Sequence, residues 1–196
     1  MKLLGITINR NFRFTKHTNL TVSKVNYRLA HIAKLLSDRH LKMVTSVLQW
    51  GLELAGKDKT NLKKLQKCQN SILRLLTDSD KRMSIRLMLQ RTNMLNVQNM
   101  TRLNTMVLVR RAILEGQCPK TMKFVKMPSE NSRLKRIDDR LARDTRHADN
   151  AQLVVGIKLL NQMHWYRDKG KKESAKTFKK KAKEFLLANF DNQNIK

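Results

Sequence analysis

One segment, residues 62–77, constrains the fold most, because its apolar and cationic side chains separate at helical spacing. Four apolar residues fall on one face of an α-helix: Leu62, Leu65, Ile72 and Leu76. Four polar residues fall on the opposite face: Lys63, Lys67, Asn70 and Arg74. The segment therefore predicts a helix that buries one side and presents a cationic stripe on the other.

Apolar residues recur at the same three-and-four spacing along most of the chain, which predicts a mainly α fold organised as a helical bundle. Besides 62–77, helices are expected at these places: 19–36, 41–52, 84–90 and 97–114. Gly56 is expected to end the second of these, because glycine commonly follows a helix C-terminus. Thr60 is expected to cap the helix of residues 62–77.

The N-terminal residues carry the only β signal. Ile6 and Ile8 alternate with a polar residue, residues 9–11 read Asn-Arg-Asn, and the alternation resumes at Phe12. This pattern predicts a short β-hairpin over residues 3–14 with its turn at 9–11. An isolated hairpin is marginal in water, so it is expected to pack on other parts of the protein.

Composition divides the chain into four expected segments. They are a hairpin at 1–17, a helical bundle at 18–127, a charged linker at 128–150 and a basic C-terminal helical segment at 151–196. Apolar character returns at 154–163, after the linker. Ser174 is then expected to cap a basic helix with a narrow apolar stripe that includes Phe178.

The charge balance points to a polyanionic partner. Lys and Arg total 42 against 15 acidic residues, which gives a formal net charge of +27. A compact protein with this charge repels itself unless an anion screens it, and nucleic acid is the usual screening partner. An anionic membrane surface is the next candidate. No apolar run is long enough to span a membrane and no signal peptide is evident, so a nuclear or cytoplasmic location is expected.

The basic helix faces supply the candidate phosphate-binding residues. These are Lys63, Lys64, Lys67, Arg74, Arg110, Arg111, Lys179, Lys180 and Lys181. Each phosphate contact releases counterions and adds affinity that does not depend on base sequence. The few aromatic residues are not interleaved with the basic clusters, so base stacking is not the expected mode of binding. Trp50 and the phenylalanines are expected in the core.

Catalytic patterns are not found in the sequence. It holds no Gly-rich phosphate loop, no GxSxG and no HExxH motif. The run Ile137-Asp138-Asp139 superficially resembles the Asp-Asp turn of polymerases, but its arginine-rich flanks indicate a solvated charge cluster. Two cysteines and five histidines are scattered without metal-ligand spacing. No catalytic residue, metal or cofactor is therefore assigned, and an isolated enzyme is not expected.

Four blocks resemble, in order, the region after the polymerase active site in reverse transcriptases of non-LTR retrotransposons. The first is Leu-Gly-Ile-Thr-Ile-Asn at 4–9, and the second is 51–53 leading into 62–77. The third is Gly-Ile-Lys-Leu-Leu-Asn at 156–161, preceded by Thr145-Arg146, and the fourth is the basic helix from 178 to 187. The third block departs from the Gly-Pro-Lys-Leu-Trp-Asn pattern of the family, because Ile157 and Leu160 stand at its Pro and Trp.

The resemblance implies a primer grip and a thumb that hold the backbone of an RNA–DNA or other duplex. Leu4, Gly5 and Ile6 would correspond to the primer grip. It implies no working polymerase, since fingers and palm carboxylates are expected upstream of this sequence. Alternatives are a free-standing or domesticated basic RNA- or DNA-binding protein, or one part of an RNA-directed DNA polymerase completed by the missing palm and fingers. A basic amphipathic protein at an anionic membrane is the remaining alternative.

Overall fold

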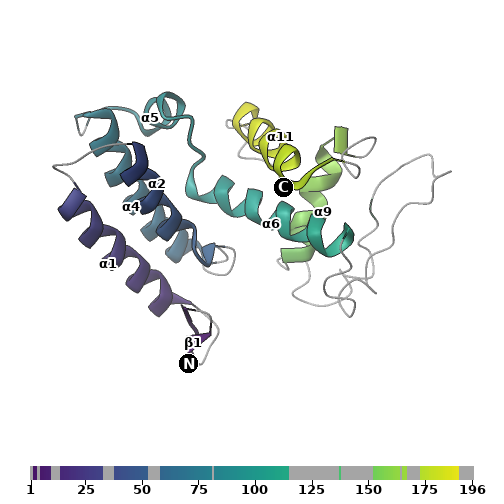
Figure 1. Cartoon of the computed structure of the whole chain (residues 1–196), viewed down its shortest axis with the longest axis horizontal. Coiled ribbons are helices and arrows are strands. Elements are labelled where there is room, and N and C mark those ends of the chain that lie inside the picture. Colours follow the sequence, from purple (N-terminus) through teal and green to yellow (C-terminus); the bar gives the residue numbers. More distant parts are fainter. Residues whose placement is uncertain are drawn as a thin grey trace. The chain divides into compact units, whose positions relative to one another are not determined.

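Helices make up most of the chain that the structure describes (Figure 1). The structure is a computed structural model, and it describes residues 2–3, 5–9, 14–32, 38–52, 58–80, 82–114, 137, 152–163, 165–166 and 173–189. The helices are α1 (Thr15–Ile32), α2 (Asp38–Gln49), α4 (Lys59–Thr77), α5 (Ile85–Arg91), α6 (Val97–Leu114), α9 (Gln152–Gln162) and α11 (Ala175–Ala188). The strands are β1 (Lys2–Leu3) and β2 (Ile6–Thr7). The predicted mainly α class, with a short N-terminal hairpin and a basic C-terminal helix, is confirmed.

The hairpin forms, but its turn lies earlier than expected. Strands β1 and β2 are antiparallel and pair Lys2 with Thr7 and Leu3 with Ile6, and Gly5 lies in the turn between them. Gly5 has a φ of +80°, in the left-handed region that glycine adopts at no steric cost. The predicted turn at 9–11 is not the turn of this hairpin, and residues 10–13, which include most of that turn and Phe12, lie outside the described residues.

Two helix boundaries also differ from expectation. Helix α2 ends at Gln49, and Gly51 takes a φ of +69°, so the glycine that follows this helix is Gly51. Gly56, the predicted stop, lies outside the described residues. Helix α4 is capped by Asp58, whose side chain accepts a hydrogen bond of 2.8 Å from the backbone N–H of Thr60. Asp58, and not the predicted Thr60, is therefore the cap residue, and Thr60 donates the hydrogen bond. The Asp58 carboxylate also suits the positive end of the helix dipole.

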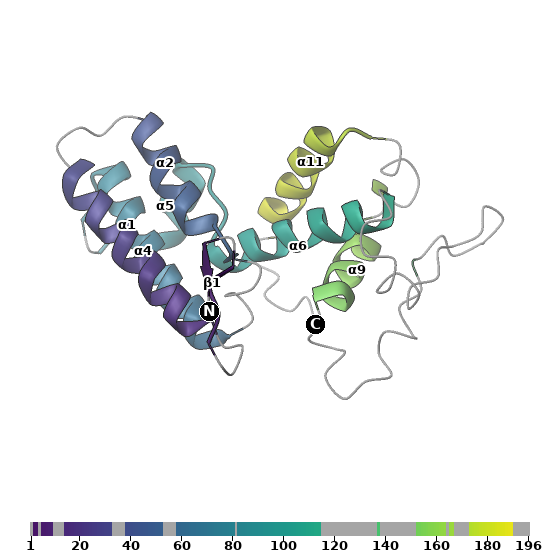
Figure 2. The ribbon, with the colours of Figure 1, turned by 60° about the horizontal axis from the view of Figure 1, so that its bottom comes forward.

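The chain divides into two compact units, Met1–Thr101 and Arg102–Lys196, and the division falls within α6. In Met1–Thr101, helix α1 packs against α2 and α4, and α4 also packs against α5. Helices α1 and α4 lie side by side in both ribbon views (Figure 1, Figure 2). The apolar core of this unit comes from all four helices and includes Val25, Leu48, Leu65, Ile72, Leu73 and Met88.

The second unit, Arg102–Lys196, has its own core. Its buried side chains come from the second half of α6, from α9 and from α11, and include Met106, Val109, Ile157, Leu160, Phe178 and Leu186. Helix α9 approaches α6 at Gly156, where a Cβ atom would lie 2.4 Å from Cγ2 of Val109. Buried Ile137 is bonded through both its backbone N–H and its carbonyl to the Asn161 side chain, each at 3.0 Å. The rest of the expected linker, 128–150, lies outside the described residues.

Candidate nucleic-acid interface

Helix α4 separates its apolar and cationic faces much as the sequence predicts. Leu65 and Ile72 are only 2% and 1% exposed, whereas Lys63 and Lys67 are exposed. Lys64 and Arg74 are half-buried, and the Nε atom of Arg74 is covered. The exposed part of the predicted stripe is therefore centred on the first half of α4.

A groove of about 440 Å³ runs beside these lysines, between α1 and α4. We call it the α1/α4 groove, and its lining residues are Asn19, Val22, Ser23, Asn26, Lys64, Lys67, Cys68 and Ser71. Nζ of Lys64 donates a hydrogen bond of 2.9 Å to Oδ1 of Asn19, so this bond joins α4 to α1 at the groove. Every described lining residue is neutral or cationic, so the groove combines positive charge with amide and hydroxyl groups.

Cys68 adds no negative charge to this groove. Burial raises the pKa of its thiol to about 11, because a thiolate would be poorly solvated there. The thiol is therefore neutral near pH 7, and its sulfur lies 3.9 Å from Oδ1 of Asn26. A neutral Cys68 preserves the positive character that Lys64 and Lys67 give to the groove.

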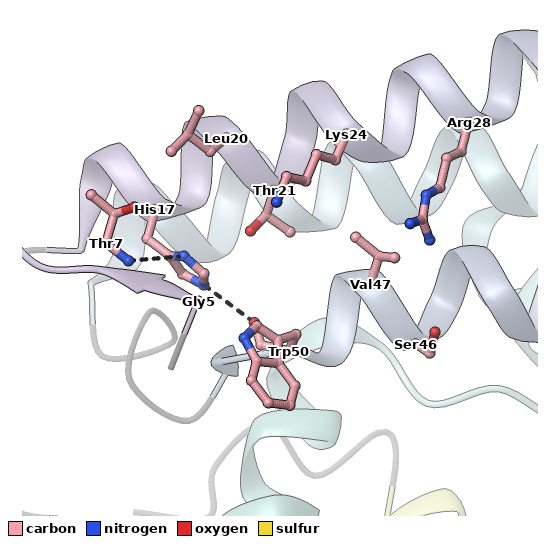
Figure 3. Close-up of a pocket in the computed structure, with 10 residues that line it drawn as sticks. All are labelled: Gly5, Thr7, His17, Leu20, Thr21, Lys24, Arg28, Ser46, Val47 and Trp50. Atoms are coloured by element: carbon pink, nitrogen blue, oxygen red, sulfur yellow. Dashed lines mark hydrogen bonds between the residues drawn. The ribbon is translucent and has the colours of Figure 1, made fainter. Parts of the chain in front are cut away.

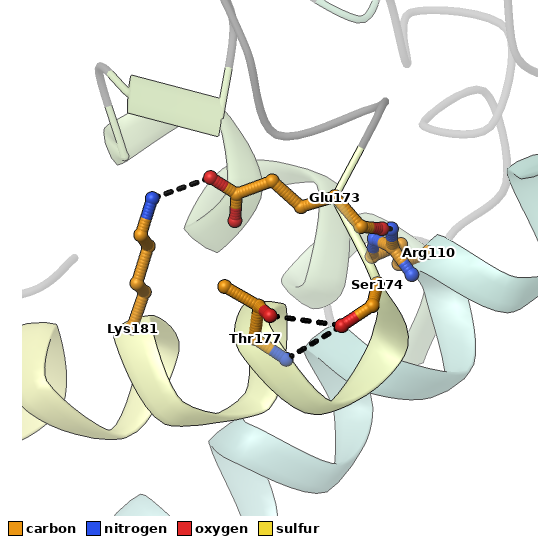
Figure 4. A network of polar contacts seen from close by, with 5 residues as sticks. All are labelled: Arg110, Glu173, Ser174, Thr177 and Lys181. Carbon is orange, nitrogen blue, oxygen red and sulfur yellow. Dashed lines mark hydrogen bonds and ion pairs between the residues drawn. The ribbon is translucent and has the colours of Figure 1, made fainter.

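The C-terminal candidates lie on α11, in the second unit. Ser174 caps this helix as predicted, and its Oγ accepts a hydrogen bond of 3.1 Å from the backbone N–H of Thr177 (Figure 4). Lys179 and Lys180 are exposed. Lys181 is also exposed but forms an ion pair with Glu173 and lies 5.2 Å from the centre of the Trp165 ring. Its charge is thus partly neutralised within the protein, unlike a purely solvated lysine.

Arg110 and Arg111 are neighbours in sequence but differ in environment. Arg111 is exposed, whereas Arg110 is 6% exposed and donates a hydrogen bond to the backbone carbonyl of Glu173 (Figure 4). The Arg110 guanidinium lies 4.9 Å from the centre of the Phe178 ring. Burial raises the pKa of Tyr166, and the Arg110 charge opposes this rise. Arg110 therefore belongs to the interior of the second unit, not to the surface where the sequence placed it.

We expect Arg110→Gln to destabilise the Arg102–Lys196 unit by about 2 kcal/mol, the usual range for a lost hydrogen bond to a charged group. Arg111→Gln removes the same charge from an exposed position and should leave stability within about 0.5 kcal/mol of the parent. Urea denaturation followed by the fluorescence of Trp165 would measure both, in a Trp50→Phe background. Equal stability of the two variants would mean that Arg110 contributes no buried contact.

A second cavity, of about 570 Å³, lies between the hairpin, α1 and α2 (Figure 3). We call it the Trp50 pocket, and ten of the described residues line it, Gly5, Lys24, Arg28, Ser46 and Trp50 among them. The predicted primer-grip residues were Leu4, Gly5 and Ile6. Gly5 lines this pocket, Ile6 is half-buried, and Leu4 lies outside the described residues.

His17 fixes one end of the Trp50 pocket. Its Nδ1 accepts a hydrogen bond of 3.5 Å from the backbone N–H of Thr7, and its Nε2 lies 3.3 Å from the carbonyl oxygen of Trp50 (Figure 3). The tautomer with the proton on Nε2 satisfies both contacts. A Cβ atom at Gly51 would lie 2.8 Å from the same Nε2, so glycine is required here both for its φ and for space. His17 thereby links the hairpin to the end of α2.

Trp50 is not a core residue, and its expected place in the core was wrong. Its side chain is 58% exposed, because it follows α2 at the rim of the pocket, where Gly5 offers no side chain to cover it. Lys24 and Arg28 were not singled out by sequence either. They are four residues apart on α1 and Thr21 precedes them by one turn, so a search for polar stripes at helical spacing would have found them.

Metal-binding clusters and membrane-spanning helices were also sought among the described residues. Within them, no group of three or more His, Cys, Asp or Glu side chains is placed to hold a metal ion. None of the described helices is long and apolar enough to cross a membrane. Asp138 and Asp139 lie outside the described residues. No protein-family model, no curated protein and no solved structure matches this chain.

Proposed function

We propose that the Met1–Thr101 unit binds the sugar-phosphate backbone of nucleic acid through the α1/α4 groove. The observation that carries this proposal is the groove itself, whose concave surface is lined by Lys64 and Lys67. Lys63, which precedes Lys64 in sequence, is exposed. Phosphate oxygens accept hydrogen bonds from lysine, from amide N–H groups and from hydroxyls, and such contacts position a protein without reading bases.

The groove suits a phosphate chain better than a small anion. Its polar groups come from two helices that run side by side, with Asn19, Ser23 and Asn26 on α1 facing Lys64 and Ser71 on α4. Donors repeat along both helices at successive turns, so several phosphates can be contacted in a row. The net charge of +27 adds a long-range attraction for any polyanion.

The resemblance of the chain to the primer grip and thumb of non-LTR retrotransposon reverse transcriptases supports the same proposal. In that role the groove would hold the backbone of a primer–template duplex, and catalysis would come from a palm supplied elsewhere. A free-standing RNA- or DNA-binding protein would use the groove in the same way. Preference for an RNA–DNA hybrid over duplex DNA of the same sequence favours the first role.

Binding to duplex should fall steeply with salt. With on the order of six phosphate contacts on duplex DNA, a fourfold rise in salt should weaken binding by about three decades. Replacing Lys63, Lys64 and Lys67 together by glutamine should lower the slope of log affinity against log salt by about three units. Fluorescence anisotropy of a labelled duplex at several salt concentrations would measure both quantities.

The matched control changes Arg82, Arg86 and Arg91 to glutamine. All three are exposed in the same unit, their loss lowers the charge equally, and none is among the groove residues. This control should change the salt slope by less than one unit. Equal effects of the two triple variants would remove the groove as the binding surface, and a stronger preference for anionic vesicles over duplex would replace nucleic acid by a membrane partner.

A further inference from the structure

The Trp50 pocket lies on the opposite side of α1 from the α1/α4 groove. Leu20, Thr21, Lys24 and Arg28 line the pocket, whereas Asn19, Val22, Ser23 and Asn26 line the groove. At the helical period these two sets fall on opposite faces of α1. The pocket is therefore a separate site, and a ligand bound there does not need the groove.

The pocket offers positive charge on its α1 side and hydroxyl groups from both α1 and α2. Lys24 is exposed and Arg28 half-buried, and they are one helical turn apart on α1 (Figure 3). Thr21 on α1 and Ser46 on α2 line the same cavity. Every described lining residue is neutral or cationic, so the cavity suits an anionic group beside Lys24 and Arg28.

The opposite end of the pocket offers a flat aromatic surface. Trp50 is 58% exposed, and its indole Nε1 lies 3.5 Å from where a Cβ atom of Gly5 would be. The hydrogen bond between His17 and the Trp50 carbonyl holds the backbone of this residue in place. An exposed tryptophan on a fixed backbone is a platform on which a planar ring can stack, and nucleobases of every kind stack on such surfaces.

We propose that the Trp50 pocket binds a nucleotide, with the base stacked on Trp50 and the phosphate held by Lys24 and Arg28. The cavity of about 570 Å³ falls within the range of about 300–1,000 Å³ that small-molecule sites occupy. A free nucleotide and an unpaired nucleotide at the end of a strand share this chemistry. The site adds single-nucleotide recognition to backbone binding and does not depend on the proposed role of the groove.

Trp50 fluorescence tests the proposal directly. The chain has two tryptophans, so Trp165→Phe leaves Trp50 as the only one. Titration with AMP should quench this fluorescence to a plateau, because the base stacks on the indole, whereas inorganic phosphate at matched ionic strength should not. Trp50→Ala, which removes an exposed side chain, should keep the helical circular dichroism and lose AMP binding in calorimetry. Absence of saturable AMP binding to the parent chain overturns the proposal.

Matched lysine variants locate the phosphate. Lys24→Gln should weaken AMP binding about tenfold, the loss expected for one charge-assisted contact. Lys16→Gln makes the same change on the same helix at an exposed position outside the pocket, and it should leave AMP binding unchanged. Equal loss in both variants would mean that only net charge matters, which also overturns the proposal.

A duplex with a one-nucleotide overhang distinguishes the two sources of the nucleotide. Tighter binding than to the blunt duplex, lost on Trp50→Ala, assigns the pocket to a strand end, and equal binding assigns it to a free nucleotide. The Lys63, Lys64 and Lys67 triple variant should retain AMP binding in either case. Failure of the groove and failure of the pocket are therefore separate results.

Discussion

Leu65→Asp is expected to unfold the Met1–Thr101 unit. Leu65 is 2% exposed on the face of α4 that packs against α1 and α2, so the substitution removes a buried side chain and introduces a carboxylate without a partner. Loss of the leucine alone costs about 2–5 kcal/mol, and burial of an unpaired charge costs several kcal/mol more. Since domains are stable by about 5–15 kcal/mol, the sum is enough to unfold the unit.

Lys67→Glu is the control, because Lys67 lies on the same helix and is exposed. Its charge reversal should leave the fold intact while weakening duplex binding. Each unit contains one tryptophan, so Trp50 fluorescence in a Trp165→Phe background follows this unit alone. If Leu65→Asp still gave a cooperative urea transition at the midpoint of the parent, the assigned buried face of α4 would be incorrect.

Gly156→Val should destabilise the Arg102–Lys196 unit by about 3 kcal/mol or more, because overfilling a packed interior forces side chains and backbone to move. Even the Cβ atom alone would lie 2.4 Å from Cγ2 of Val109 and 3.0 Å from its Cβ. Helix propensity predicts the opposite sign for Gly156→Ala, a gain of about 1 kcal/mol. Gly156→Ala therefore distinguishes the two effects. If close packing against Val109 dominates, as we expect, the stability of the unit should fall and not rise.

Val109→Ala should partly rescue Gly156→Val, because it removes the methyl group that the new side chain meets first. The two substitutions should consequently be non-additive, and a double-mutant cycle measures their coupling energy. Urea denaturation followed by Trp165 fluorescence in a Trp50→Phe background gives the four stabilities. Additive effects would indicate that the two residues do not touch.

The helices could be predicted from sequence because each buries one stripe of apolar side chains at a regular spacing. Helix α4 is the clearest case, with Leu65 and Ile72 buried and Lys63 and Lys67 exposed. The ends of elements were harder to predict, since the hairpin turn at Gly5 and the end of α2 before Gly51 depend on the backbone conformations of single glycines. Local sequence allows several glycines and asparagines to serve as turns, and tertiary packing selects among them.

The candidate sites were predictable only where a single helix presents its cations to solvent. Arg110 was assigned to the surface by its charge, yet it follows Met106 by four residues and Leu103 by seven, which places it on the buried face of α6. The Trp50 pocket needs contacts between the hairpin, α1 and α2, and no spacing rule within one segment predicts such contacts. The α1/α4 groove could likewise not be predicted from α4 alone, because half of its lining residues come from α1.

The hydrogen bond between Thr7 and His17 also determines how the N-terminal hairpin can come apart from the helices. Strands of two residues each are too short to be stable alone, so the hairpin is ordered by its contacts with α1 and with Trp50 and Gly51, which follow α2. Separating it from the helices requires the bond between the Thr7 N–H and His17 to break, while the helix–helix core built on Val25, Leu48 and Leu65 stays packed. The free energy of this local opening is therefore lower than that of unfolding the unit. The wall of the Trp50 pocket that carries Gly5 consequently belongs to the less stable part of the unit, and the wall that carries Lys24 and Arg28 belongs to the more stable part.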